Sequence, residues 1–165
     1  LNGNAPRHYY GADAQLKIKN LFGNIGNTEF RAEYILGTHS VTQNNNETPT
    51  ALLTGTDGFY VRKFNGAYFY FIQDLGSSKN QMVVKYDWFD PNTLVKGTEI
   101  GAVGSNLTAA NIKYSTLGIG YINHITPNAK LVLYYSFVKN ENTSLSGYTN
   151  DVKDNILTCR LQFRF

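Results

Sequence analysis

The strictest pattern in this sequence is a two-residue alternation of apolar and polar side chains, and it is clearest in the closing run NILTCRLQFRF. Apolar residues occupy every second position of that run, namely Leu157, Cys159, Leu161, Phe163 and Phe165. Successive side chains of a β-strand point to opposite faces of a sheet. The run therefore predicts a strand with one apolar and one polar face, from about residue 152 to residue 165.

Six further segments support the same interpretation. Five of them alternate in the same way: 10–21, 28–38, 80–90, 112–124 and 129–139. The sixth, 59–73, contains the run AYFYF and is apolar on both sides, so the pattern does not assign its faces. Because no segment follows the period of an amphipathic helix, we predict an all-β, antiparallel fold of about seven strands.

The composition separates this chain from an ordinary soluble sheet. Charged residues make up 16% of it, against ~25% in soluble domains. Mean hydropathy is −0.32, and the sequence has no run of ~18 apolar residues that would form a transmembrane helix. A transmembrane strand needs only ~9–11 residues with alternate side chains apolar, so a membrane-spanning barrel is polar on average. The composition is therefore compatible with a transmembrane β-barrel.

The predicted connections alternate between short and long. Short turns rich in Gly, Asn and Pro fall at 23–27, 74–79 and 125–128, and long polar loops fall at 39–58, 91–111 and 140–151. Bacterial outer-membrane barrels have short periplasmic turns and long extracellular loops. We therefore predict an antiparallel transmembrane β-barrel in the outer membrane of a Gram-negative bacterium, with the short turns on the periplasmic side.

An odd number of strands is one short of the even number usual in such barrels. We therefore expect the chain to be the C-terminal part of a larger up-and-down barrel. In this interpretation residues 1–8 are the remnant of a loop and residues 9–165 belong to the barrel.

The alternation assigns a set of basic residues to the water-filled lumen, since a cation facing lipid at mid-depth would cost ~2–4 kcal/mol. These residues could act as successive weak sites for anions. The acidic residues Asp13, Glu29, Glu33 and Asp87 share that face, so salt bridges within the wall are the alternative role. The predicted lumen cations are Lys17, Lys19, Arg31, Lys85, Arg160 and Arg164.

The opposite side chains are predicted to contact lipid. In the last strand these are Leu157, Leu161 and Phe163, together with Cys159. Aromatic residues near strand ends are typical of the two membrane interfaces of a barrel. The predicted interface residues are Tyr10, Trp88, Phe89, Tyr121 and Phe165.

Four stretches of the sequence, in this order, resemble the C-terminal part of the phosphate-selective porin O and P family of Bacteroidetes-type bacteria. They are AQLKIKN…TEFRAEYILG, NQMVVKYDWFDPN, YSTLGIGYI…TPNAKLVLYY and DNILTCRLQFRF. The resemblance spans the chain from about residue 9. It implies a homotrimeric porin of about sixteen strands per barrel through which small anions, phosphate among them, diffuse passively. The terminal strand also resembles the signal read by the barrel-assembly machinery.

Other functions find little support in the sequence. His8, His39 and His124 lack a second ligand at a metal-site spacing, and neither a phosphate loop nor a nucleophile elbow is present. We therefore expect no catalytic residues, cofactor or metal, and the dispersed basic residues argue against nucleic-acid binding. Two alternatives to a porin remain open. One is a small non-pore outer-membrane barrel acting as an enzyme or adhesin, and the other is a soluble ligand-binding β-barrel.

Overall fold

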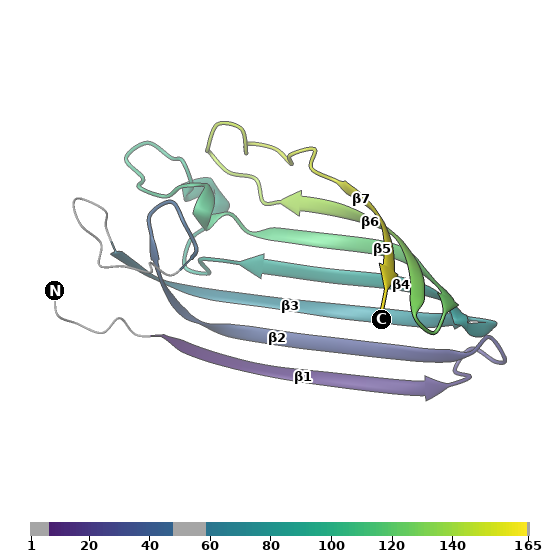
Figure 1. Cartoon of the computed structure of the whole chain (residues 1–165). Coiled ribbons are helices and arrows are strands. Elements are labelled where there is room, and N and C mark those ends of the chain that lie inside the picture. The colour runs from purple at the N-terminus through teal and green to yellow at the C-terminus, as the bar shows by residue number, and fades with distance from the viewer. Residues whose placement is uncertain (1–6, 48–58, 165) are drawn as a thin grey trace.

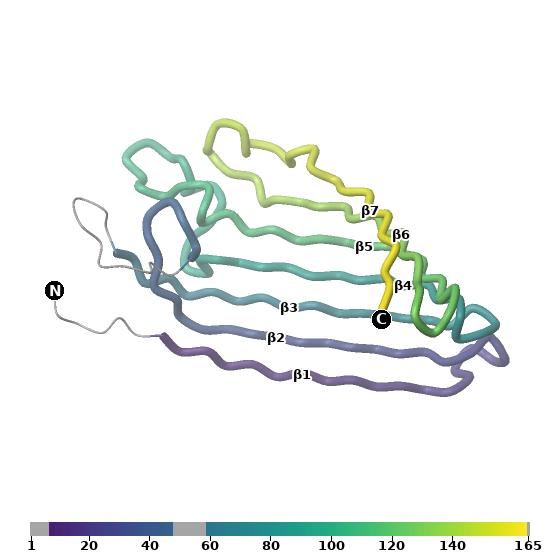
Figure 2. The backbone as a smooth tube through the Cα atoms, in the orientation of Figure 1, coloured from purple at the N-terminus to yellow at the C-terminus, as the bar shows by residue number. Residues whose placement is uncertain are grey.

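The computed structural model describes residues 7–47 and 59–164, which form one sheet of seven antiparallel strands (Figure 1). Each strand pairs with its neighbours in sequence, in the order β1-β2-β3-β4-β5-β6-β7, and the tube in Figure 2 follows the same up-and-down path. The predicted all-β, antiparallel fold is confirmed. The strands are β1 (His8–Lys19), β2 (Asn27–Thr42), β3 (Phe59–Leu75), β4 (Ser77–Asp90), β5 (Tyr114–Thr126), β6 (Ala129–Asn140) and β7 (Ile156–Phe163).

Short and long connections lie at opposite ends of the sheet. Residues 20–26, 76 and 127–128 connect strands at one end, here called the turn end, on the right in Figure 1. The connections after β2, β4 and β6, of which residues 43–47, 91–113 and 141–155 are described, lie at the other end, the loop end. The predicted alternation is confirmed. Gly76 makes the tightest turn with a φ of 73°, a conformation that glycine adopts without steric cost.

In the described ranges 7–47 and 59–164, helix is limited to the 3-10 turns η1 (Gly97–Glu99) and η2 (Ala109–Asn111), both in the loop between β4 and β5. Within the described residues, no helix has the length and apolar character needed to cross a membrane.

The strand register divides the sheet into two chemically distinct faces, because directly paired residues of antiparallel strands point to the same side. On the apolar face, the central row across the sheet is Leu16, Phe30, Phe71, Val84, Ile119, Tyr135 and Leu157. On the polar face, the neighbouring row is Gln15, Arg31, Tyr70, Lys85, Gly118, Ser136 and Ile156.

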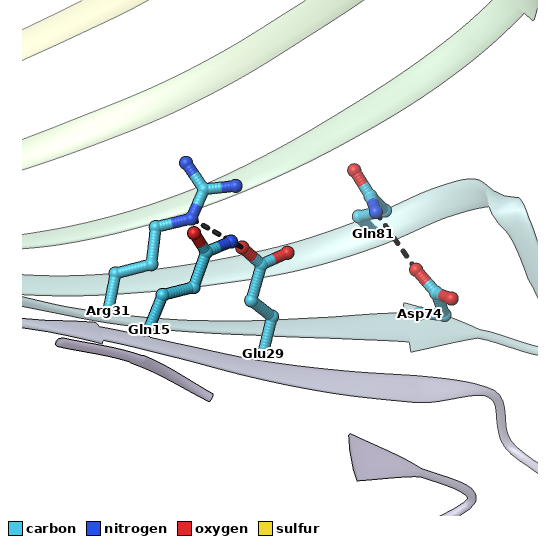
Figure 3. A network of polar contacts seen from close by, with 5 residues as sticks. All are labelled: Gln15, Glu29, Arg31, Asp74 and Gln81. Carbon is cyan, nitrogen blue, oxygen red and sulfur yellow. Dashed lines mark hydrogen bonds and ion pairs between the residues drawn. The ribbon is translucent and has the colours of Figure 1, made fainter. Parts of the chain in front are cut away.

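The sheet is curved, and the polar face lies on its concave side. Gln15, Glu29 and Arg31 project from β1 and β2 toward the side over which the later strands arch (Figure 3). The apolar face is convex and strongly exposed: Leu16 is 56% exposed, Ile119 47% and Leu157 73%. Strands contact mainly their neighbours within the sheet, so no second described layer covers this face.

Most of the best-buried residues lie at the loop end, although Thr28 at the turn end is also fully buried. Val41, Ile100 and Ile112 are at most 1% exposed, and buried polar residues such as Asn111 and Asn140 accompany them. This burial explains why β2 continues beyond the predicted end at residue 38. His39, Ser40 and Val41 are covered by loops, which the alternation of the strand does not show. The buried core is therefore formed by loops against strand ends.

Candidate functional site

The centre of the polar face carries charges that are paired with one another. The Arg31 Nε lies 2.5 Å from Glu29 Oε1, and Gln15 Nε2 donates to the same carboxylate oxygen (Figure 3). Glu29 and Arg31 are two residues apart on β2 and therefore share a face. The salt bridge that the sequence offered as an alternative role for Arg31 is present.

Lys85 is paired in the same way. Its Nζ lies 2.9 Å from Asp87 Oδ2, and it also sits 5.5 Å from the centre of the Tyr70 ring. A cation over an aromatic face is attracted by the ring quadrupole. Arg31 and Lys85 therefore lie on the predicted face, but each has a carboxylate partner that offsets its charge.

The run AYFYF in β3, whose faces the sequence left open, is resolved by the register. Tyr68 pairs with Glu33 and Asp87 on the polar face, whereas Phe69 pairs with Tyr86 on the apolar face. The Tyr68 hydroxyl is within hydrogen-bonding reach of the Glu33 carboxylate. The hydroxyl group is thus what distinguishes the two sides of this strand.

Two glycines of β5 make room for a tyrosine on the polar face. A Cβ at Gly118 would lie 1.7 Å from the Tyr134 hydroxyl oxygen, and one at Gly120 would lie 2.4 Å from the Tyr134 ring. The ring of Tyr134 therefore packs directly on the β5 backbone. Its buried hydroxyl has no hydrogen-bond partner within the described part of the chain.

The remaining predicted lumen cations lie toward the turn end. Lys17 and Lys19 are in the second half of β1, and Arg160 is on β7, directly opposite Val132 of the polar face. Arg164 follows β7, and its backbone N–H donates to the Asn128 carbonyl at 2.8 Å. Among residues 7–47 and 59–164, no carboxylate lies within 4.0 Å of these four basic groups. These four therefore form no salt bridge in this part of the chain, although Lys17 lies directly opposite Glu29 in the register.

The predicted lipid and interface residues within the described chain lie on the apolar face, with one exception. Trp88 lies toward the loop end, where its Nε1 donates to Asn65 Oδ1 at 3.1 Å. Tyr121 lies toward the turn end and donates to Asn80 Oδ1 at 2.6 Å. The other residues placed on this face are Tyr10, Leu157, Cys159, Leu161 and Phe163.

The exception is Phe89. The prediction for Phe89 was wrong, since neighbouring residues of a strand alternate and Trp88 takes the apolar side. Phe89 instead lies on the polar face, with its ring 6.0 Å from that of Phe64. Phe165 lies outside the described residues.

Sequence reasoning missed a polar cluster at the loop end, centred on Arg62 of β3. Arg62 is 4% exposed. Its guanidinium donates to the carbonyls of Thr42 and Gln43 at 3.2 and 2.8 Å, to Asn46 Oδ1 at 2.8 Å and to the Ala110 carbonyl at 3.4 Å. One side chain thereby connects the β2–β3 loop to the β4–β5 loop.

The loops that Arg62 connects fold over the polar face. Arg62 is directly opposite His39, and both share a side with Phe64. The His39 Nε2 lies 3.1 Å from the Pro91 carbonyl, and Asn46 Nδ2 donates to the Ala110 carbonyl at 2.8 Å. The concave side is therefore partly covered at the loop end and less so toward the turns. The alternation pattern of the strands does not indicate this cluster, because its contacts join Arg62 to loop residues distant in the sequence.

Comparison with known proteins gave no match to this chain among family models, curated proteins or solved structures.

Proposed function

We propose that this chain forms part of the wall of a porin in the outer membrane of a Gram-negative bacterium. Its polar face would border a water-filled channel through which small anions such as phosphate diffuse. The observation that carries the proposal is the exposed apolar face, which extends across all seven strands. An apolar surface of that extent is unfavourable in water at ~25 cal/mol per Å². Contact with lipid removes this cost.

Strand length supports the same proposal. Strands β1 to β6 contain between 12 and 17 residues. A tilted strand needs only ~9–11 residues to cross the hydrocarbon core. Each of these strands is therefore long enough to span the membrane and extend beyond it.

The strand directions support a larger barrel. β1 and β7 both run from the loop end to the turn end, so pairing them with each other would be parallel. Closure by antiparallel pairing alone needs an odd number of further strands between them. A barrel of about sixteen strands, as implied by the porin resemblance, meets this condition. Open edges in hydrocarbon would leave backbone groups unpaired, which is strongly unfavourable.

The anion preference in this proposal comes from cations toward the turn end. Arg31 and Lys85 are offset by Glu29 and Asp87. Lys17, Lys19, Arg160 and Arg164 remain to attract anions, and rings of basic side chains favour anions in pores. At the other end, the loops connected by Arg62 would narrow the entrance.

The test is planar-bilayer conductance of the protein purified from its native membrane. We expect stable conductance steps. In a salt gradient, the sign of the reversal potential should show that anions permeate more readily than cations. The double variant Lys19→Gln, Arg160→Gln should lower the anion preference. The matched control, Glu29→Gln with Arg31→Gln, removes one charge of each sign and should leave it unchanged.

Each of the other results would contradict a different part of the proposal. Cation preference would overturn the anion assignment while leaving a pore. A folded, membrane-inserted protein without conductance would favour the non-pore barrel. A protein that stays dissolved without detergent would favour the soluble β-barrel.

A further inference from the structure

Lys139 is an exception on the apolar face. Consider the apolar face between the row of paired residues that contains Trp88, toward the loop end, and the row that contains Leu161, toward the turn end. Every described residue paired on that part of the face is uncharged apart from Lys139. A lysine facing lipid is costly at mid-depth but costs only ~0–1 kcal/mol near the interface. Lys139 is exposed and next to the last residue of β6, at the loop end. Its ammonium group can therefore reach the headgroup region while its stem stays in lipid.

A hollow of about 460 Å³ lies beside Lys139 on the same face. Its apolar lining comes from Tyr86, Leu117 and Phe137 on three neighbouring strands. The rest of the lining is Ser115, Val138, Asp151 and Asn155. The hollow thus combines an apolar wall with one cation, Lys139, and one carboxylate, Asp151.

The hollow exists because β7 begins well short of the loop end of the sheet. Its first residue, Ile156, pairs with Ser136, so the ladder does not reach the end of β6. The segment before β7, residues 151–155, is attached to the loop end of β6 through side chains. Asn155 Oδ1 accepts from the Val138 N–H, and Asp151 Oδ1 accepts from the Asn140 N–H, both at 3.0 Å. One oxygen of the carboxylate at this hollow is thereby used by the backbone.

We infer that this hollow binds an anionic, phosphate-bearing membrane lipid, with the headgroup at Lys139 and an acyl chain along Leu117 and Phe137. This inference rests on the proposed function, since it requires the apolar face to meet lipid. Lys139 selects the occupant: it is the one basic group of the lining, the Asp151 carboxylate accepts from the Asn140 N–H, and lysines near an interface attract anionic lipids. The turn end of the same face presents neutral Asn80, Tyr121 and Asn123 instead.

Trp88 provides the test. It is the only tryptophan of the chain, and it lies in the same row as Lys139, two strands away, which places it at a distance of about 10 Å. The protein purified from its native membrane, with every tryptophan outside residues 1–165 replaced by phenylalanine, is reconstituted in phosphatidylcholine bilayers with a small fraction of brominated lipid, either phosphatidylglycerol or phosphatidylcholine. Bromine quenches tryptophan fluorescence at short range, so the difference between the two lipids measures enrichment of the anionic one.

We expect phosphatidylglycerol to be enriched about fivefold near Trp88. Lys139→Gln should abolish the enrichment, and Lys139→Arg should retain it. The matched control is Lys63→Gln, which removes the exposed lysine two rows beyond Trp88 and outside the hollow, and it should leave the enrichment unchanged.

Equal quenching by the two lipids in the unchanged protein would overturn the lipid site and leave the membrane wall intact. An equal loss in Lys63→Gln would also overturn it, since it would show diffuse surface attraction. Absence of quenching by either lipid would contradict the proposed function itself, because Trp88 would then not face lipid.

Discussion

At the loop end of this molecule the buried side chains are largely polar, whereas along the strands the exposed side chains are largely apolar. Arg62 is 4% exposed and Leu157 is 73% exposed, the reverse of their usual places in a soluble protein. The loop end meets its hydrogen-bonding needs internally, with Arg62 bonded to backbone carbonyls of two loops. The strand wall leaves its apolar face for the surroundings to cover.

This difference shows which part of the fold depends on its environment. Irregular loops must satisfy their backbone groups wherever water is excluded. The buried side chains at the loop end do this, as when Asn111 Nδ2 donates to the Thr108 carbonyl at 3.2 Å. The seven-stranded sheet has satisfied backbone ladders between neighbouring strands but lacks cover on its apolar side. We therefore expect substitutions at the loop end to lower stability by removing hydrogen bonds. Substitutions on the strands should change stability according to whether the apolar face contacts lipid or water.

The largest effect is expected at the loop end. Arg62→Ala removes donors from four acceptors and leaves buried carbonyls unpaired, at ~3–4 kcal/mol of unfolding free energy. Hydrogen exchange should rise in 43–47 and 106–111 and stay unchanged in β5 to β7. Denaturant unfolding of the same variant measures the loss of stability.

The control for this change is Lys63→Ala, because Lys63 is the neighbouring residue on β3 and is exposed. Lys63→Ala should shift the midpoint of denaturant unfolding little. An Arg62→Ala protein that unfolds like the unchanged one would contradict the role given to this side chain.

The next largest effect is expected in the wall. Leu157→Arg places a charge on the central row of the apolar face and should destabilise the protein in bilayers by ~2–3 kcal/mol. Thr158→Arg, one residue along on the polar face, should cost much less. Both are measured by reversible denaturation from lipid vesicles. An arginine at Leu157 that is neutral or stabilising would show that this face meets water.

The two-faced antiparallel sheet could be predicted from sequence because the alternation is its direct physical cause. In β7 and β2 the period alone separates the faces that the register shows, with Leu157 opposite in face to Thr158 and Phe30 to Arg31. The faces of β3 could not be predicted, because tyrosine and phenylalanine differ there by a single hydroxyl. Only pairing with Glu33 and Tyr86 distinguishes Tyr68 from Phe69.

The loop end could not be predicted, for a different reason. Its contacts join residues far apart in the chain, such as Arg62 with Ala110. No local period records such contacts. The paired state of Lys85 was also hidden, although Asp87 follows two residues later on the same face. Spacing shows that two charges can meet, and geometry shows that they do.

A smaller effect is expected within the polar face. Glu29→Gln removes the carboxylate that offsets Arg31 and leaves a free guanidinium toward the proposed channel. The reversal potential in a salt gradient should move modestly toward anions. A shift toward cations would contradict the arrangement of charges described for this face.

The smallest effect is a pH dependence confined to the loop end. His39 lies near the loop end of β2. Burial lowers the pKa of His39, the hydrogen bond with the Pro91 carbonyl opposes this shift, and the positive charge of Arg62 adds to it. The folded protein then takes up a proton less readily than the unfolded one. Stability is therefore complete above the ordinary histidine value of about 6.5 and declines as the pH falls below it.

Hydrogen exchange of the loop end between about pH 7 and pH 5, corrected for intrinsic rates, measures this decline. His39→Gln should flatten it, whereas His124→Gln, at the other end of the sheet, should not. Loop protection that increases on acidification would contradict the assignment.

The most direct test of the central claim compares one thiol on each face. Cys159 is the only cysteine of the chain and lies exposed on the apolar face. Ser136, on the polar face, can be exchanged in a Ser136→Cys, Cys159→Ala variant. Thiols react as thiolates, which need water. In intact membranes, a water-soluble maleimide should label the variant and spare Cys159 of the unchanged protein until it is unfolded. Labelling of Cys159 at the same rate as the variant would show that the apolar face meets water, and would contradict the account.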